Sequence, residues 1–150
     1  MGGKQPRFFL DANILFSAVH DPESRSAVLM AFAKQGRCAL VSSSYAAEEA
    51  RRNIELKRPR ALVRFKQILR GVRLVQEAPA DLVRRVALEQ DLPAADAPIL
   101  AAAFQARVEY LVTGDRSHFG HLMDRRHPTL PVQVLSLANT LALLPQKGLM

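Results

Sequence analysis

Acidic side chains stand at several points where an apolar run ends or a helical pattern begins. Asp11 directly follows the run "RFFL", and Asp115 follows "YLVTG". Asp96 opens a helical pattern shortly before that second run, and Glu48 and Glu49 fall in the first turns of another. Taken singly, each has an ordinary explanation as a helix cap, a turn residue or a solvated helix carboxylate. Together they suggest acids converging on one end of a sheet, where open α/β folds bind ligands.

Converging carboxylates repel one another, and this repulsion indicates what else such a site needs. Two unit charges about 4 Å apart cost roughly 1 kcal/mol in water and about 4 kcal/mol at an effective dielectric constant of 20. A cluster is tolerable if some members take up protons or if a divalent cation lies among them. Oxygen ligands of this kind suit Mg²⁺ or Mn²⁺ rather than Zn²⁺. No cysteine and histidine set offers a zinc site, and we interpret His118 and His121 as surface residues.

The basic residues are concentrated in one segment. The chain has a net charge of +7, and between Arg51 and Arg73 nine basic residues stand against the single acid Glu55. That segment carries the whole positive excess, so one face or edge of the molecule should be strongly positive. Such a face is expected of a protein that attracts a polyanion, nucleic acid above all. The alternative is a solvated helix pair whose long basic side chains cover apolar surface.

Five short apolar runs predict the strands that would position these acids. Each is mostly continuous in its hydrophobicity, which is typical of strands buried on both faces of a parallel sheet. The runs are Arg7–Leu10, Cys38–Ser42, Val72–Val75, Tyr110–Thr113 and Val132–Leu135.

Helical periodicity between these runs predicts six helices. They are Ser24–Gly36, Ser44–Arg58, Ala61–Gly71, Ala80–Gln90, Asp96–Val108 and Ser136–Leu144. Gly36 is the expected C-terminal cap of the first helix, and Asp81 is the expected N-terminal cap of the fourth. The turn-rich segment Gly120–Pro131 is predicted to be a surface loop.

The alternation of strand and helix predicts an α/β fold with a central, mainly parallel five-stranded sheet flanked by helices. The 150 residues fit a single domain, with residues 1–6 as a flexible tail. No run approaches the roughly 18 apolar residues that a membrane span needs. The lone Cys38 permits no intrachain disulfide, and we expect a buried thiol in a reducing, cytoplasmic protein.

Three segments in order, "FFLDANIL", "SSSYAAEEARRNI" and "DAPILAAAFQARVEYLVTGD", resemble the PIN domain. This is the nuclease fold of the VapC-type toxins of toxin–antitoxin pairs. The resemblance runs from Phe8 to about Asp115, and its most specific part is the block D-x-P-x-L-A-A-A followed by "YLVTGD". It implies a PIN-like, three-layer fold. Ala12 stands where a hydroxyl residue is often found, which is a mild departure.

The resemblance also implies which residues form the catalytic and metal site. Asp11, Asp96 and Asp115 match the family's first, third and fourth acidic positions. The second is Glu48 or Glu49, and Glu49 is favoured because it directly precedes "ARRNI".

The implied activity is that of a ribonuclease dependent on Mg²⁺ or Mn²⁺. The ion would polarise the scissile phosphate and acidify the attacking water. Asn13 and Thr113 would orient the ligands or touch phosphate. One ion or two are both compatible with this ligand set.

Partners follow from the same resemblance and from the charge. The basic segment would track the RNA backbone, with Arg51, Arg52, Lys57 and Arg58 as the expected contacts. Tyr45 is the aromatic residue best placed for base stacking, with core packing as its better interpretation. A toxin nuclease would also need a cognate antitoxin, and a second copy of the chain is a further expected partner.

Two other hypotheses differ in class. A PIN-like module could bind RNA or a partner without catalysis. An α/β phosphotransfer enzyme could use Asp11 as a nucleophile, since a strand-end aspartate can form an aspartyl-phosphate. Such enzymes carry D-x-D after the first strand, whereas here the third position is Asn13.

Overall fold

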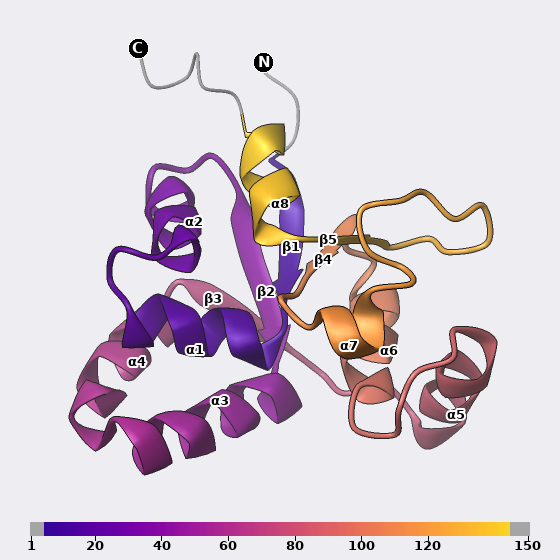
Figure 1. The fold of residues 1–150 in the computed structure, drawn as a ribbon, viewed down its shortest axis with the longest axis horizontal. Coiled ribbons are helices and arrows are strands. Elements are labelled where there is room, and N and C mark those ends of the chain that lie inside the picture. Colours follow the sequence, from indigo (N-terminus) through magenta and orange to yellow (C-terminus); the bar gives the residue numbers. More distant parts are fainter. Residues whose placement is uncertain (1–4, 145–150) are drawn as a thin grey trace.

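A five-stranded parallel sheet forms the centre of the computed structural model, which describes residues 5–144 (Figure 1). Its strands are β1 (Arg7–Leu10), β2 (Ala39–Ser43), β3 (Val72–Val75), β4 (Tyr110–Val112) and β5 (Gln133–Leu135). They lie in the order β3-β2-β1-β4-β5, and every neighbouring pair is parallel. The predicted fold class is therefore confirmed, with strand ends displaced by one residue in β2, β4 and β5. Residues 1–4 of the predicted tail lie outside the described residues.

Helices fill the connections between the strands. They are α1 (Ala12–His20), α2 (Arg25–Lys34), α3 (Ser44–Lys57), the 3₁₀ turn η1 (Pro59–Ala61), α4 (Leu62–Leu69), α5 (Ala80–Glu89), α6 (Ala97–Ala106), α7 (Arg116–Phe119) and α8 (Leu137–Leu143). All six predicted helices are present, somewhat shorter than expected. The sequence pattern did not predict α1 or α7. The segment of α1 was missed because its apolar residues read as a continuation of β1. The helix α7 was missed because it is a single turn of four residues.

The helix ends correct one capping prediction and support another. Asp81 is not the N-cap of α5, because the helix begins at Ala80 with Pro79 at the cap, which places Asp81 in the first turn. An acid there still faces the positive end of the helix dipole. Gly36 follows α2 with a φ of +78°, the left-handed conformation that glycine adopts without steric cost.

The central strand and the helix before β4 form the most deeply buried part of the core. Phe8, Phe9 and Leu10 of β1 are completely buried. On α6, Ala97 and the run Ala101–Ala103 are also completely buried, so this helix presents small side chains to its neighbours. Small residues allow close approach of the backbone, which fixes the N-terminus of α6 relative to the sheet.

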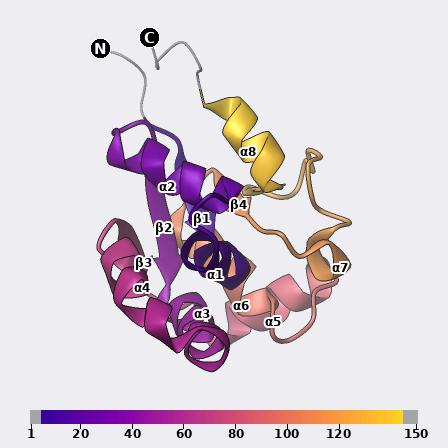
Figure 2. The same ribbon diagram turned by 60° about the vertical axis from the view of Figure 1, so that its left-hand side comes forward.

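Two groups of helices surround this core. The helices α2, α3 and α4 all pack against α1, whereas α5 packs against α6, and Figures 1 and 2 show these groups in different parts of the molecule.

None of the helices in residues 5–144 is long and apolar enough to cross a membrane. Cys38 is buried, as expected.

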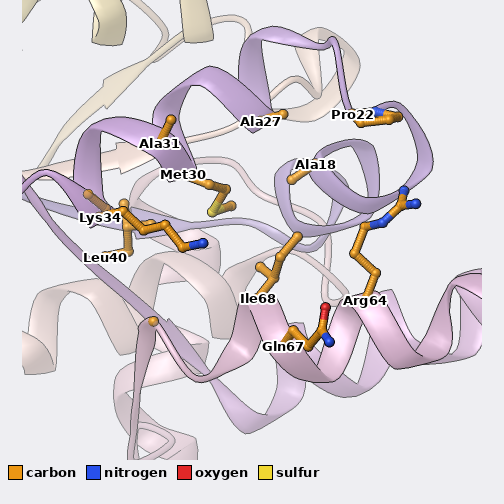
Figure 3. Close-up of a pocket in the computed structure, with 12 residues that line it drawn as sticks. Ala18, Pro22, Ala27, Met30, Ala31, Lys34, Leu40, Arg64, Gln67 and Ile68 are labelled. Carbon is orange, nitrogen blue, oxygen red and sulfur yellow. The ribbon is translucent and has the colours of Figure 1, made fainter.

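A cavity of about 390 Å³ lies between α1, α2 and α4 (Figure 3). Ala18, Met30, Leu40 and Ile68 give it an apolar lining, and Lys34 and Arg64 add basic groups. None of the predicted acidic site residues lines it. The chemistry implied by the carboxylates therefore belongs to another part of the surface.

Candidate metal and active site

The sheet order places a ligand-binding position beside β1. The chain runs from β1 to β2 and β3 on one side and then returns to β4 and β5 on the other. In open α/β sheets, ligands bind at the carboxyl ends of the strands where the order reverses in this way. Asp11 directly follows β1, and Asp115 follows the end of β4 after Thr113 and Gly114, so these two acids flank the reversal.

Asp11 is both a helix cap and a buried carboxylate of this site. Its side chain accepts a hydrogen bond from the Ala12 backbone N–H at 2.7 Å and caps α1. Its other oxygen accepts from the Thr113 hydroxyl at 2.8 Å and from Asn13 Nδ2 at 3.1 Å. With 5% of its surface exposed, Asp11 is the one charged residue among the buried polar groups of the described chain.

Thr113 and Asn13 connect the ends of β1 and β4. The Thr113 hydroxyl, completely buried, accepts from the Asp115 backbone N–H at 3.0 Å while it donates to Asp11. The Asn13 side-chain oxygen accepts from the Gly114 backbone N–H at 2.9 Å. These bonds hold the loop after β4 against the start of α1, and they bring both residues into contact with the acids that they were expected to orient.

Two helices bring the remaining acids to the same edge of the sheet. Asp96 occupies the N-cap position of α6 but forms no side-chain cap, so its carboxylate is available to the site. Glu49 projects from the second turn of α3, the helix that follows β2. Electrostatic coupling links Glu49 to Asp96 and Asp115, and it links Asp11 to Glu49 and Asp96. The four predicted acids therefore lie near one another at this edge.

His118 is an exposed residue, as expected, but its ring also contacts two acids of this group. Its Nδ1 lies 2.8 Å from Asp115 Oδ2 and 3.2 Å from Asp96 Oδ2. Asp115 caps α7 by accepting from the His118 backbone N–H at 3.1 Å, and this turn brings the ring to the two carboxylates. His121, in contrast, has its Nε2 2.6 Å from the Gln90 carbonyl oxygen.

Burial and mutual repulsion raise the pKa of the clustered acids. Desolvation raises the pKa of Asp11 to about 6, against the lowering effect of the hydrogen bonds from Thr113 and Ala12. Desolvation and the neighbouring carboxylates also raise the pKa of Glu49 and of Asp96, although His118 opposes the shift in Asp96. The hydrogen bond to Asp115 raises the pKa of His118. These shifts are those of a site that favours added positive charge.

The two adjacent glutamates of α3 differ in their surroundings. Glu48 forms an ion pair with Arg51 at 2.8 Å and lies 3.9 Å from Arg52, and the hydrogen bond from Arg51 lowers its pKa. Glu49 instead interacts with the acids of the site. Arg51 also binds Glu55 at 3.1 Å, so this expected RNA contact is engaged with carboxylates of its own helix.

Tyr45 is partly buried and packs against the core, which was the interpretation favoured over base stacking. Its hydroxyl donates to the Ala95 carbonyl oxygen at 2.9 Å and thereby ties α3 to the residue before Asp96.

The donor set fits a divalent cation. One ligand atom from each of Asp96, Asp115 and His118 lies within 4.8 Å of the other two. The buried Asp11 and the exposed Glu49 add oxygen donors that are electrostatically coupled to this group. Carboxylate oxygens with water are the usual ligands of Mg²⁺ and Mn²⁺.

A family model described as the PIN domain matches residues 7–117, which span the four predicted acids. The chain belongs to the PIN-domain family. The match begins with β1 and ends within α7, so it leaves β5 and α8 beyond it. No curated protein matches the chain by sequence.

Solved structures share this PIN fold at low sequence identity. PAE2754 from Pyrobaculum aerophilum is 19% identical with a TM-score of 0.63, covering 94% of this chain and 96% of that one. VapBC2 from Rickettsia felis, solved bound to a DNA fragment from its promoter, is 16% identical with a TM-score of 0.63 and coverage of 86% and 96%. VapC20 from Mycobacterium tuberculosis, a Sarcin-Ricin loop cleaving toxin, is 14% identical with a TM-score of 0.55 and coverage of 73% and 91%.

Proposed function

We propose that this PIN-domain protein is an endoribonuclease dependent on Mg²⁺ or Mn²⁺, and the toxin of a toxin–antitoxin pair. The observation that carries the proposal is the convergence of Asp11, Glu49, Asp96 and Asp115, from four different parts of the chain, on the point where the sheet order reverses. The similar fold of VapC20, a toxin that cleaves the Sarcin-Ricin loop, supports RNA as the substrate.

In this proposal the carboxylates hold the ion and orient the substrate. A divalent ion would supply polarisation of the scissile phosphate and a lower pKa for the attacking water. Asp11 is held in place by hydrogen bonds from Thr113 and Ala12, so its carboxylate would bind an ion without first having to be ordered. Glu49 is exposed and has a raised pKa, which suits a group that accepts a proton from water.

The basic segment would guide the RNA backbone toward these acids. Arg52, Lys57 and Arg58 are exposed on or just after α3, the helix that carries Glu49. Contacts of this kind bind phosphate without choosing a sequence. Arg51 contributes less, because its guanidinium is paired with Glu48 and Glu55.

An antitoxin is part of the same proposal. One similar structure is a toxin–antitoxin complex from Klebsiella pneumoniae, and another is VapBC-1 from nontypeable Haemophilus influenzae. Co-expression with the product of the neighbouring gene should yield a complex with suppressed cleavage.

The test is cleavage of a labelled single-stranded RNA by the purified protein with Mg²⁺, with Mn²⁺ and with EDTA. Cleavage should require the ion and should fall by roughly a hundredfold or more in Asp11→Asn, because the ligand set loses a charge at its most buried position. Equal cleavage by wild type and variant would reject the site. Salt-sensitive binding that persists in EDTA, with no cleavage of any RNA tested, would favour the binding module instead.

A further inference from the structure

Two carboxylates of the site share one imidazole nitrogen. Nδ1 of His118 lies 2.8 Å from Asp115 Oδ2 and 3.2 Å from Asp96 Oδ2. We propose that His118 is itself a ligand of the ion held by these carboxylates, and that its nitrogen shifts the preference of the site from Mg²⁺ toward a transition-metal ion. This inference rests on the proposed metal site and adds to it a residue and a selectivity.

The distances from His118 Nδ1 to the two carboxylate oxygens match those between neighbouring ligands around one small ion. In an octahedral site with ligands about 2.1 Å from the ion, adjacent ligand atoms are about 3 Å apart. The two nitrogen–oxygen distances, 2.8 and 3.2 Å, lie on either side of that value. An ion could therefore be held by His118, Asp96 and Asp115 with small movements of the side chains.

The local fold holds the ring in this position. The Asp115 carboxylate accepts from the His118 backbone N–H at 3.1 Å, so one residue both caps α7 and contacts the ring that α7 carries. Phe119, the next residue, is completely buried and anchors the turn in the core. The His118 side chain is 49% exposed, which leaves the ring free to exchange its proton with water. Coordination through Nδ1 needs the neutral ring with its hydrogen on Nε2.

A nitrogen ligand changes which ions the site prefers. Mg²⁺ is bound almost entirely by oxygen, whereas imidazole binds divalent ions of the first transition row more strongly. A site made only of Asp11, Glu49, Asp96 and Asp115 would have no such preference built into its donor atoms. His118 introduces one, and its loss should weaken Mn²⁺ binding far more than Mg²⁺ binding.

The experiment uses Mn²⁺ as the probe, because its electron spin reports on directly bound nitrogen. Pulsed electron paramagnetic resonance of the Mn²⁺-loaded protein should show ¹⁴N modulation that is absent in His118→Ala. His121→Ala is the matched control, since the His121 ring contacts the Gln90 carbonyl oxygen instead of the acids, and it should keep the signal. Titration should show roughly a tenfold or greater loss of Mn²⁺ affinity in His118→Ala, with a smaller change for Mg²⁺ measured by competition. Circular dichroism checks that each variant is folded.

The outcomes separate this inference from the proposed function. Mn²⁺ bound by wild type without ¹⁴N modulation would overturn the role of His118 and leave the carboxylate site standing. The same modulation in wild type and in His118→Ala would also overturn it. Failure of wild type and variants alike to bind Mn²⁺ or Mg²⁺ would overturn the proposed metal site and, with it, this inference.

Discussion

The two roles of Asp11 explain why a carboxylate interrupts an apolar run in the middle of the sheet. As a helix cap it satisfies the first backbone N–H of α1, and as a buried acid it is desolvated among other acids. A serine or asparagine could cap the helix equally well. The retention of a charge that burial disfavours is therefore better explained by the site than by the helix.

Replacing Asp11 with asparagine should flatten the dependence of the folding stability on pH, measured in EDTA. The pKa of Asp11 is raised from 3.8 to about 6 in the folded state, so between these values the folded protein binds more protons than the unfolded chain. Stability should therefore fall as pH rises through this window and stay lower above it. Asp11→Asn removes this titration, so between about pH 4 and pH 7 the free energy of unfolding of the wild type should fall by on the order of 1–3 kcal/mol more than that of the variant. Urea unfolding across the acidic to neutral range measures both pH dependences, and the same dependence in wild type and variant would contradict the assignment.

The adjacent glutamates of α3 offer a matched pair of variants. Glu49→Gln should lower Mn²⁺ affinity by about tenfold to a hundredfold, because it removes a carboxylate coupled to Asp96 and Asp115. Glu48→Gln should leave that affinity nearly unchanged, since Glu48 is engaged with Arg51 and Arg52. Calorimetric titration of both variants with Mn²⁺ shows which of the two glutamates contributes to ion binding. The reverse order of effects would assign the second acidic position to Glu48.

At the residue scale, the sequence pattern pointed to the acids but did not reveal the contacts of His118 with two of them. Asp11, Asp96 and Asp115 could be found because they stand at the ends of strand and helix patterns. The contacts of His118 depend on the single turn of α7, which the sequence pattern did not reveal. The one sequence feature that could have indicated these contacts is that His118 follows Asp115 by three positions. A residue at that spacing after a helix-capping aspartate can place its side chain against the aspartate.

At the scale of elements, the strands were easier to predict than the first helix. Five short apolar runs became five strands, although the expected burial on both faces fails for the edge strand β3, where Arg73 and Leu74 are exposed. The segment Ala12–His20 carries the same apolar character on a helix, with five buried residues in nine. Composition therefore could not distinguish it from the end of β1. Asp11 as an N-cap was the one local signal that a helix begins there.

The packing of α6 should be sensitive to side-chain size. Ala102 is completely buried on this helix, whose N-terminus carries Asp96. Ala102→Leu should destabilise the fold by about 1–3 kcal/mol through overpacking. Ala138→Leu, at an exposed position of α8, is the control and should cost little. Thermal unfolding compares the two, and equal effects would contradict this close packing.

For the whole molecule, charge is divided between an acidic site and a basic flank, which consists of the nine basic residues from Arg51 to Arg73. They lie on α3, η1, α4, β3 and the turns that join them, and all but Arg51 are exposed. The positions of the charged residues along the sequence were enough to predict this concentration of positive charge. They could not indicate which guanidinium groups are paired within the chain, because that depends on side-chain geometry on α3.

The salt dependence of RNA binding should report the basic flank. In an Asp11→Asn background that prevents cleavage, Arg52→Ala and Arg58→Ala should each reduce the slope of log affinity against log salt by about 0.7, because each removes a cation that neutralises one phosphate of the single strand. Arg85→Ala on α5 is the control outside the flank and should leave the slope unchanged. Fluorescence anisotropy with labelled single-stranded RNA measures these slopes. An unchanged slope in both flank variants would place the RNA elsewhere.

The acids at the carboxyl edge of the sheet should hold one catalytic metal site, and the proposed activity depends on it. The most direct test is X-ray diffraction from crystals grown with Mn²⁺, with data collected at the manganese absorption edge. We expect an anomalous peak within about 2–2.5 Å of carboxylate oxygens of Asp11, Asp96 or Asp115. A well-ordered site with no anomalous peak, or a peak confined to other residues, would contradict the metal site.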